Sequence, residues 1–246
     1  MGPLRVLGVI PARLASTRLP RKVLREIAGV PMVCHVYRRA SRSELLSDLL
    51  VATDSEEVVA ACQRYGIPTV MTSPDHPSGT DRVWEVACGR AADIYVNIQG
   101  DEPLVTSGHI NALVEPFQRR PETQVVTLKA RATPEEAANP NVVKVVTDVR
   151  GNALYFSRNP IPYDRNRTGA VTYWKHVGLY AFRREALEVF HRFSSSALET
   201  AERLEQLRFL ENGIPIHVVE TFEPIIGVDT EEDLLAAEAH LGKPSQ

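Results

Sequence analysis

Short apolar runs rich in β-branched residues alternate with stretches of helical periodicity through the first half of this chain. Strands are predicted at residues 4–10, 48–52, 69–72 and 94–98, and helices at residues 31–41, 54–65, 79–91 and 107–119. In the second helix, Asp54 and Glu57 have the spacing of a capping box. Because strands that alternate with helices pair in parallel, this rhythm predicts an α/β fold, a doubly wound parallel sheet covered by helices on both faces.

The pattern changes after residue 123. Strands are predicted at residues 124–129, 142–148, 153–157 and 173–182, with a hairpin turn at residues 150–152. A helical period runs from Leu198 to Leu210 and stops at Asn212 and Gly213, before a strand at residues 216–219. A last helix opens at Thr230. We therefore expect a single domain over residues 1–246, with an antiparallel β insertion at about 124–182 that serves as an oligomer interface.

Composition excludes several classes of protein. With 43% hydrophobic and 24% charged residues, the chain is typical of a soluble globular protein. A net charge of -3 argues against a nucleic-acid binder. No charge-free run is long enough to span a bilayer, and no signal peptide or usual dinucleotide or P-loop motif is found. The odd count of 3 cysteines favours a reducing, cytoplasmic location with buried thiols.

The small net charge hides an asymmetry between the ends of the chain. Residues 1–25 carry six cations and no acid, whereas residues 220–246 carry seven acids and one lysine. The ends could be solvated by chance, could be tails, or could form two halves of one polar site.

Ligands bind open α/β sheets at the carboxyl ends of the strands, so the loops there are the candidate sites. The loop at residues 11–22 offers four cations and two hydroxyls, which suits a triphosphate; a solvated basic loop is the alternative. Asp101 directly follows a buried strand and could hold Mg²⁺, or could bond its own turn. Asp229 could be a second metal ligand or a helix-start residue. Residues 77–82 begin a helix whose N–H groups could meet a base or phosphate, unless Ser78 and Thr80 only cap it.

Together these loops resemble the 3-deoxy-D-manno-octulosonate (Kdo) cytidylyltransferases, also called CMP-Kdo synthetases. The resemblance covers residues 6–235 in order. It is carried by residues 10–22, by Ser-Gly-Thr-Asp-Arg at 78–82, by Asn-Ile-Gln-Gly-Asp-Glu-Pro at 97–103, and by residues 139–146, 153–158, 175–180, 204–208 and 227–230. Each motif is short, but their order along nearly the whole chain is specific.

The resemblance implies a Rossmann-like nucleotidyltransferase fold, mostly parallel with an antiparallel β insertion. It also implies transfer of CMP from CTP to the anomeric 2-hydroxyl of Kdo for lipopolysaccharide biosynthesis, by a cytoplasmic homodimer that inserts into no membrane. The site residues carried over are Arg13, Ser16, Arg18 and Lys22 for the phosphates, Ser78, Gly79, Thr80 and Arg82 for the cytidine, Asp101 and Asp229 for Mg²⁺, and Gln99, Arg158, His176, Tyr180, Glu205 and Gln206 for the sugar acid.

The chain departs from the family around Lys22, where Gly and Pro are usual at the positions of Arg21 and Val23. Residues 194–203 are also only loosely similar, which bears on the choice of sugar. An 8-amino-Kdo or another 2-keto sugar acid is therefore an alternative acceptor. A catalytically inactive nucleotide-binding homologue is the alternative from a different class.

Overall fold

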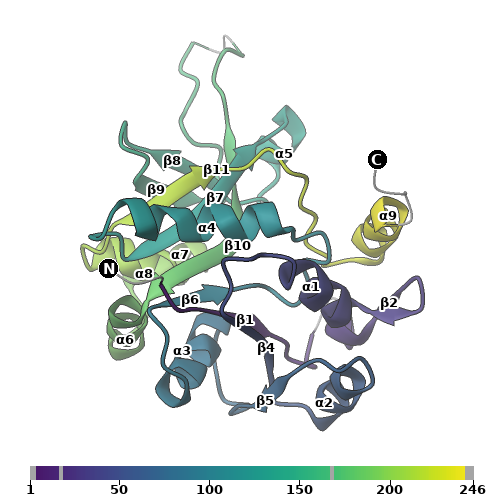
Figure 1. Cartoon of the computed structure of the whole chain (residues 1–246). Helices are drawn as coiled ribbons and strands as arrows, with labels where there is room; N and C mark the ends of the chain where they lie inside the picture. Colours follow the sequence, from purple (N-terminus) through teal and green to yellow (C-terminus); the bar gives the residue numbers. More distant parts are fainter. Residues whose placement is uncertain (1–3, 17–18, 167–168, 242–246) are drawn as a thin grey trace.

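A computed structural model describes residues 4–16, 19–166 and 169–241, and shows a mixed sheet between two layers of helices (Figure 1). The sheet has the order β11-β7-β10-β6-β1-β4-β5. In its first half, β1 pairs in parallel with both β4 and β6, and β4 pairs in parallel with β5. The predicted parallel strands are confirmed, as β1 (Val6–Pro11), β4 (Asp48–Thr53), β5 (Thr69–Met71) and β6 (Ile94–Asn97).

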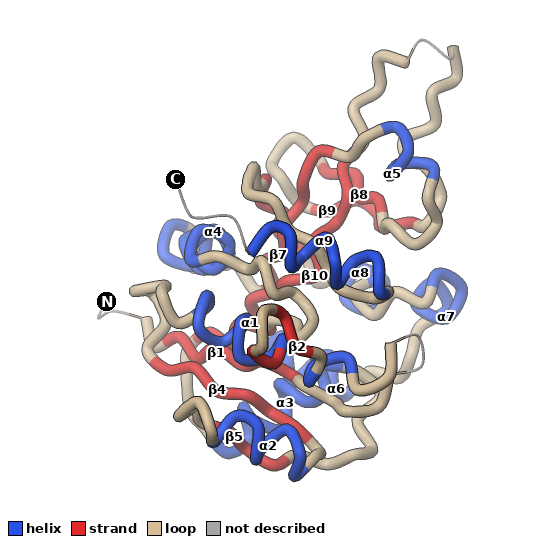
Figure 2. Tube along the Cα trace, turned by 90° about the vertical axis from the view of Figure 1, so that its right-hand side faces the viewer, coloured by secondary structure: helices blue, strands red, loops and turns tan. Residues whose placement is uncertain are grey.

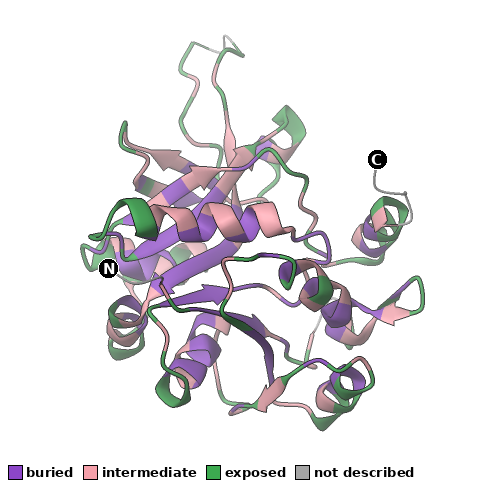
Figure 3. Cartoon of the chain, viewed as in Figure 1, coloured by how far each residue is buried: buried purple, intermediate pink, exposed green. Residues whose placement is uncertain are grey.

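Successive residues of β1 face opposite sides of the sheet, as the pleat requires. Val6 and Ile10 pack into one buried cluster, whereas Leu7 and Val9 pack into another. The first cluster lies under α1 (Met32–Ala40), α2 (Glu56–Gln63) and α4 (Ser107–Arg119), and the second lies under α3 (Gly79–Gly89). Figure 3 shows this arrangement as buried strands flanked by helices with exposed outer faces. The doubly wound fold is therefore confirmed.

The second half of the chain extends the same sheet. Its strands are β7 (Val125–Arg131), β8 (Lys144–Thr147), β9 (Ala153–Ser157), β10 (Trp174–Arg183) and β11 (Ile216–Glu220). Only β10 runs against its neighbours in the path above, because it pairs antiparallel with both β6 and β7, while β7 and β11 are parallel. The range 124–182 thus supplies two strands of the main sheet, and the β8–β9 hairpin adds to β10. A long loop before β10 extends from the body (Figure 2).

The short helices differ from the sequence prediction. The helical period predicted from Leu198 to Leu210 is divided into α7 (Ala197–Glu202) and α8 (Leu207–Glu211), because Arg203 adopts a left-handed conformation with φ of 54°. Helices α5 (Pro134–Ala138) and α6 (Arg184–Arg192) were not predicted.

Two predictions about single residues also need correction. The predicted capping box at Asp54 is wrong: Ser55 is the N-cap of α2, and the Asp54 carboxylate instead pairs with Arg82. Cys34 and Cys62 are buried as predicted, but Cys88 is exposed.

Part of the basic N-terminal region meets the acidic last helix, although the two termini lie on opposite sides of the molecule (Figure 1). The segment η1 (Lys22–Leu24), β2 (Glu26–Ile27) and β3 (Val30–Pro31) lies against the last helix, α9 (Glu231–Leu241), as Figure 1 shows. Arg25 and Glu231 form an ion pair of 2.8 Å, and the Ala28 N–H donates to Glu238. These contacts, together with the ion pair between Lys22 and Asp229, agree with the interpretation of the two charged regions as halves of one polar site.

Across the described ranges, no helix is both long enough and apolar enough to cross a membrane.

Candidate active site

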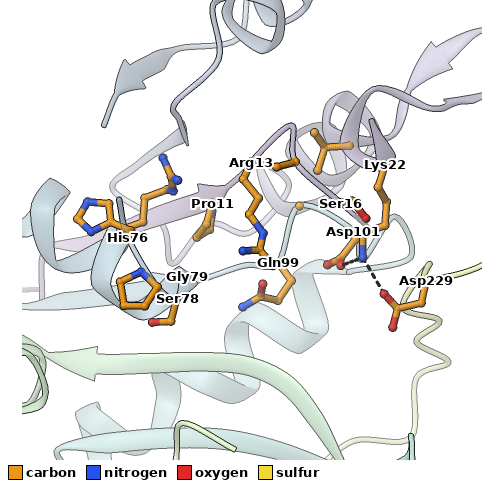
Figure 4. A pocket seen from close by; sticks show the side chains of 15 residues that line it. Pro11, Arg13, Ser16, Lys22, His76, Ser78, Gly79, Gln99, Asp101 and Asp229 are labelled. Atoms are coloured by element: carbon orange, nitrogen blue, oxygen red, sulfur yellow. Dashed lines mark hydrogen bonds and ion pairs between the residues drawn. The ribbon is translucent and has the colours of Figure 1, made fainter. Parts of the chain in front are cut away.

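A cavity of about 510 Å³ lies where β1 and β6 end and α3 begins. Many of the predicted site residues line it, namely Arg13, Ser16, Lys22, Ser78, Gly79, Arg82, Gln99, Asp101 and Asp229. In Figure 4, Lys22, Asp101 and Asp229 occupy one end, His76 and Ser78 the other, and Arg13 and Gln99 lie between them. The loops that follow the strands are therefore brought together into one polar cavity, as the carboxyl-end rule predicts.

Three charged residues from distant parts of the chain converge at one end of the cavity. The Lys22 ammonium donates to Asp101 at 2.5 Å and to Asp229 at 2.8 Å. Burial by itself lowers the pKa of Lys22, but the two carboxylates outweigh this effect and raise its pKa above the ordinary value. The Val228 N–H donates to the Asp101 carbonyl, so the two acidic loops are also joined through the backbone.

Glycine is required at the turn that presents Asp101. A Cβ on Gly100 would lie 2.8 Å from the carbonyl oxygen of Pro11, which is closer than real Cβ atoms approach backbone. The loop after β6 can therefore approach the end of β1 only without a side chain at this position. This close approach keeps Asp101 beside the loop that carries Lys22.

Glu102 is a buried carboxyl group next to this cluster. Burial, followed by the charge of Asp101, raises its pKa to about 8. Its Oε2 has no hydrogen-bond partner among the described residues. Glu102 is therefore largely protonated at neutral pH, which leaves the net charge of the cluster to Lys22, Asp101 and Asp229.

The start of α3 combines capping with cavity lining. The Ser78 hydroxyl accepts from the Asp81 N–H at 3.2 Å and donates to the Asp81 carboxylate at 2.7 Å. Ser78 and Gly79 line the cavity at the same time. Both interpretations made from the sequence for Ser78 are thus compatible, because the cap uses its hydroxyl and leaves the positive end of the helix facing the cavity.

Arg82 lines the cavity but is tied into the scaffold. Its guanidinium donates to Asp54 at 2.9 Å and to the hydroxyl of Thr72. Only 4% of its side chain is exposed. These contacts hold α3 against the ends of β4 and β5, so the guanidinium is committed to protein groups.

A second polar cluster lies beside the cavity, at the start of α3. The Thr80 hydroxyl donates to Glu205 at 2.8 Å. Within the described chain, no hydrogen-bond partner is found for four buried atoms around this bond: Asn97 Nδ2, Tyr180 Oη, Glu205 Oε2 and Gln206 Nε2. Asn97 and Tyr180 are cross-strand neighbours on β6 and β10. Buried unsatisfied polar groups are costly, and a polar ligand would satisfy them.

His176 belongs to the wall of this cluster. Its ring lies 5.4 Å from that of Tyr180 and 5.1 Å from that of Phe156, and its Nε2 shares a hydrogen bond with the Thr127 hydroxyl. Burial lowers the pKa of His176 to about 3, so the imidazole is neutral at physiological pH. A neutral ring here can act as a hydrogen-bonding group but not as a cation.

Comparison with known proteins bears on what such a site does. Residues 7–221 match the family described as Cytidylyltransferase. The 3-deoxy-manno-octulosonate cytidylyltransferase of Acidobacterium capsulatum is 58% identical over 97% of both chains. That of Koribacter versatilis is 54% identical over 96% of this chain and 90% of its own. The chain belongs to the 3-deoxy-manno-octulosonate cytidylyltransferase family.

A solved structure of a family member agrees in fold. The CMP:2-keto-3-deoxy-manno-octonic acid synthetase complexed with CTP superposes with a TM-score of 0.92 and is 44% identical, covering 96% of this chain and 98% of that one. The fold of this cytidylyltransferase is therefore the nucleotidyltransferase fold expected from the resemblance.

Some residues expected from the family do not reach the cavity of this cytidylyltransferase. The Arg158 guanidinium donates to the backbone carbonyls of Pro140, Glu202 and Arg203, which fixes the end of α7. Five other predicted residues form the second cluster or its wall and do not line the cavity: Thr80, His176, Tyr180, Glu205 and Gln206. Arg18 lies outside the described residues.

The departure from the family at Arg21 has a structural consequence. Arg21 adopts a left-handed backbone with φ of 57°, a conformation that glycine enters at no steric cost. Its side chain is exposed and pairs with Glu57. At the second departure, Val23 is buried and lines the cavity. Both changes leave Lys22 at the cavity.

Sequence reasoning missed two site residues, Asn97 and His76. Asn97 is fully buried and its Oδ1 accepts from Gln99, so it orients one of the predicted residues. Its position at the end of β6, beside Gln99, was the available signal. His76 lines the cavity and is held by Glu85. It immediately precedes the predicted segment 77–82.

Proposed function

We propose that this chain transfers CMP from CTP to the anomeric 2-hydroxyl of Kdo, giving CMP-Kdo for lipopolysaccharide biosynthesis and releasing pyrophosphate. The observation that carries the proposal is the convergence of Lys22, Asp101 and Asp229 in a cavity at the strand ends. It occurs in a chain 58% identical to a 3-deoxy-manno-octulosonate cytidylyltransferase.

The cavity suits a nucleoside triphosphate along its length. Arg13, Ser16 and Lys22 offer cationic and hydroxyl donors for phosphate oxygens. Ser78 and Gly79 at the start of α3 offer backbone N–H groups for the cytidine or its nearest phosphate. The phosphates would lie toward Lys22 and the base toward His76.

Asp101 and Asp229 fit a magnesium ion. Both carboxylates lie within hydrogen-bond distance of the same Lys22 nitrogen, so their oxygens are near enough to share one cation. Mg²⁺ commonly takes one or two carboxylates and completes its shell with phosphates and water. The described residues hold no group of three or more His, Cys, Asp or Glu placed for a metal, so phosphate and water would have to supply the remaining ligands. When bound, the ion would neutralise phosphate charge and polarise a phosphoryl oxygen.

The second cluster suits a sugar acid. Tyr180, Glu205, Gln206 and Asn97 offer the unpaired polar atoms that several hydroxyl groups would require. Gln99 lines the cavity next to them and would bridge the two substrates. The Thr80–Glu205 hydrogen bond joins the cytidine helix to this cluster, which would bring the acceptor beside the nucleotide.

In the proposed reaction the sugar 2-hydroxyl attacks the α-phosphate in line. A bond forms between the sugar oxygen and the α-phosphorus, the bond from that phosphorus to the bridging oxygen breaks, and the hydroxyl proton passes to solvent. Arg13 and Lys22 would stabilise the charge that develops on the phosphates. Holding two anions together supplies much of the remaining rate enhancement. No protein general base is assigned.

The decisive assay measures pyrophosphate release with a panel of 2-keto sugar acids and the four nucleoside triphosphates. We expect release with CTP, Mg²⁺ and Kdo. Release only with 8-amino-Kdo or a related acid would change the acceptor. CTP binding without release for any acid would identify a catalytically inactive homologue and contradict the proposal.

We also propose that the enzyme is a cytoplasmic homodimer that uses the range 124–182 as its interface. The proposal is supported by exposed apolar side chains in that range, Val149, Leu154 and Tyr163. Light scattering of the purified protein would test the dimer, and a monomer at all concentrations would contradict it.

A further inference from the structure

The position between the two candidate metal carboxylates is taken by an amino group of the chain itself. Figure 4 shows the Lys22 ammonium between Asp101 and Asp229, joined to both by dashed contacts. The nitrogen lies 2.5 Å from Asp101 Oδ2 and 2.8 Å from Asp229 Oδ1. Only 13% of the Lys22 side chain is exposed. A divalent cation that bridged the same oxygens would have to displace this ammonium.

The carboxylates are the fixed partners in this contact. A backbone hydrogen bond of 2.9 Å from the Val228 N–H to the Asp101 carbonyl joins their loops. Within its own segment, the Asp229 N–H donates to the Asp233 carboxylate at 3.0 Å. The backbone at Gly100 is confined by Pro11. Lys22 reaches the pair through a flexible four-carbon stem. The ammonium can therefore move while the two carboxylates keep their places.

A triphosphate in the same cavity would change the balance of charge. Without it, the ammonium gains most by staying between two carboxylates. With it, phosphate oxygens offer Lys22 new anionic partners, and a dication could then take the place of the ammonium between the two carboxylates. The exchange moves one cation a short distance and introduces another, so no carboxylate is left unpaired.

We propose that Lys22 is the internal counter-cation of the Asp101–Asp229 pair, and that the pair takes up a divalent cation only when a nucleoside triphosphate draws the ammonium away. This role rests on the proposed function, because it requires the same two carboxylates to be the metal ligands. It adds to Lys22 a positioning role besides phosphate binding. It also gives an order of binding, in which free metal alone does not fill the site.

The test measures metal binding without nucleotide or sugar. Mn²⁺, observed by the paramagnetic resonance signal of the free ion, is titrated into the wild-type protein and into Lys22→Met and Lys22→Gln. Without the competing ammonium, both variants should bind Mn²⁺ about tenfold more tightly than the wild type, which corresponds to about 1.4 kcal/mol. Lys22→Arg keeps the cation and should bind Mn²⁺ as weakly as the wild type.

Further variants locate the effect. Adding Asp229→Asn to Lys22→Met should abolish the gain in affinity, because it removes one of the two ligands. Arg25→Met, which removes the neighbouring Arg25–Glu231 ion pair, is the matched control and should leave Mn²⁺ affinity unchanged. Circular dichroism establishes that each variant is folded. The use of two substitutions of different polarity guards against one that fails to fold.

Equal or weaker Mn²⁺ binding by both Lys22→Met and Lys22→Gln would overturn the proposal, as would a gain that survives Asp229→Asn. The outcome is independent of the transfer reaction. If the protein releases no pyrophosphate but gains Mn²⁺ affinity on loss of Lys22, the counter-cation role stands and the proposed function is wrong. If it releases pyrophosphate but gains no Mn²⁺ affinity on loss of Lys22, the proposed function stands and the counter-cation role is wrong.

Discussion

Single residues in this protein acquire their chemistry from neighbours that are distant in the sequence. Lys22 contacts Asp101, which is 79 positions away in the sequence, and Asp229, which is 207 positions away. Each is an ordinary charged residue by itself. Together they form a cluster with one cation and two anions, beside a Glu102 that burial keeps largely protonated. Their roles can be tested one residue at a time.

Loss of the Asp101 charge should strongly reduce turnover. In Asp101→Asn, we expect kcat to fall by at least about 10²-fold, the scale of losing an electrostatic contact in the transition state. Pyrophosphate release at saturating CTP and Kdo measures the effect. Glu122→Gln is the control, an acid-to-amide change at an exposed position. Near-normal turnover of Asp101→Asn with unchanged Mg²⁺ dependence would show that Asp101 is no metal ligand.

His176 should make the stability of the protein depend on pH. Its pKa falls from 6.5 to about 3 on folding, so between these values the unfolded chain binds a proton that the folded protein does not. Stability therefore rises with pH across this window and is lost as pH falls below 6.5. At 1.36 kcal/mol per unit, the loss from pH 6.5 to 5 amounts to about 2 kcal/mol.

Urea unfolding at several pH values measures this effect. His176→Phe keeps an aromatic ring against Phe156 and Tyr180 but removes the titrating group. Its free energy of unfolding should fall less steeply between pH 6.5 and 5 than that of the wild type. Parallel slopes for the two proteins would mean that His176 does not titrate differently in the folded and unfolded states.

At the scale of elements, the site depends on how closely loops approach one another. The loop after β6 passes the end of β1 at Gly100, where no side chain can be accommodated. The start of α3 is joined to the α7–α8 connection by the Thr80–Glu205 hydrogen bond. These contacts set the distance between the Lys22 end of the cavity and the second polar cluster.

Replacement of Gly100 by alanine should therefore disturb both stability and activity. The added methyl would meet the Pro11 carbonyl at 2.8 Å, and we expect a cost of about 1–3 kcal/mol in the free energy of unfolding. Because the loop carries Asp101, kcat should fall as well. Thermal unfolding and pyrophosphate release measure the two effects.

Gly89→Ala is the matched control for this substitution. A Cβ on Gly89 meets no atom within 4 Å, and the residue ends α3 without a positive φ. It should be neutral or slightly stabilising, since alanine favours the helix. Equal effects of the two substitutions would show that the close approach at Gly100 is not what constrains the loop.

At the scale of the whole molecule, the last helix completes the site by packing against the start of the chain. Helix α9 buries Leu234 against Leu19, Ile27, Met32 and Val228, and this small cluster lies under the segment that carries Lys22 and Asp229. Ion pairing between the basic start and the acidic end adds to the contact. The charge asymmetry of the sequence is thus part of the fold.

Removal of the Leu234 side chain should loosen this contact. For Leu234→Ala we expect a loss of about 2–3 kcal/mol of stability, the lower part of the range for buried leucines because the cluster is small. Turnover should fall too, because Asp229 loses its support. Leu235, which is 64% exposed, provides the control, and Leu235→Ala should change stability by less than about 0.5 kcal/mol. Denaturant unfolding and steady-state assays of the Leu234→Ala and Leu235→Ala variants measure these effects. Equal losses of stability and turnover in the two variants would show that the cluster does not support the site.

Much of the fold could be predicted from the sequence, because local patterns decide it. The bounds predicted for the helix at residues 107–119 and the strand at residues 153–157 agree with α4 and β9. Helix α6 was missed because it follows β10 directly, with Arg183 as both last strand residue and N-cap, and no Gly or Pro marks the change. The break at Arg203 was missed because an arginine gives no signal for a left-handed turn.

Sequence by itself determined the alternation of strands and helices along the first half of the chain, the loops that form the cavity and most of the residues that line it. These follow from periodicity and from short motifs, which depend on neighbours along the chain. Only the tertiary structure decided that Lys22 lies between Asp101 and Asp229, that Arg158 binds backbone carbonyls, and that Asn97 belongs to the polar cluster. Those facts depend on which loops approach one another and on which polar groups are thereby brought into contact, and neither is recorded in local sequence.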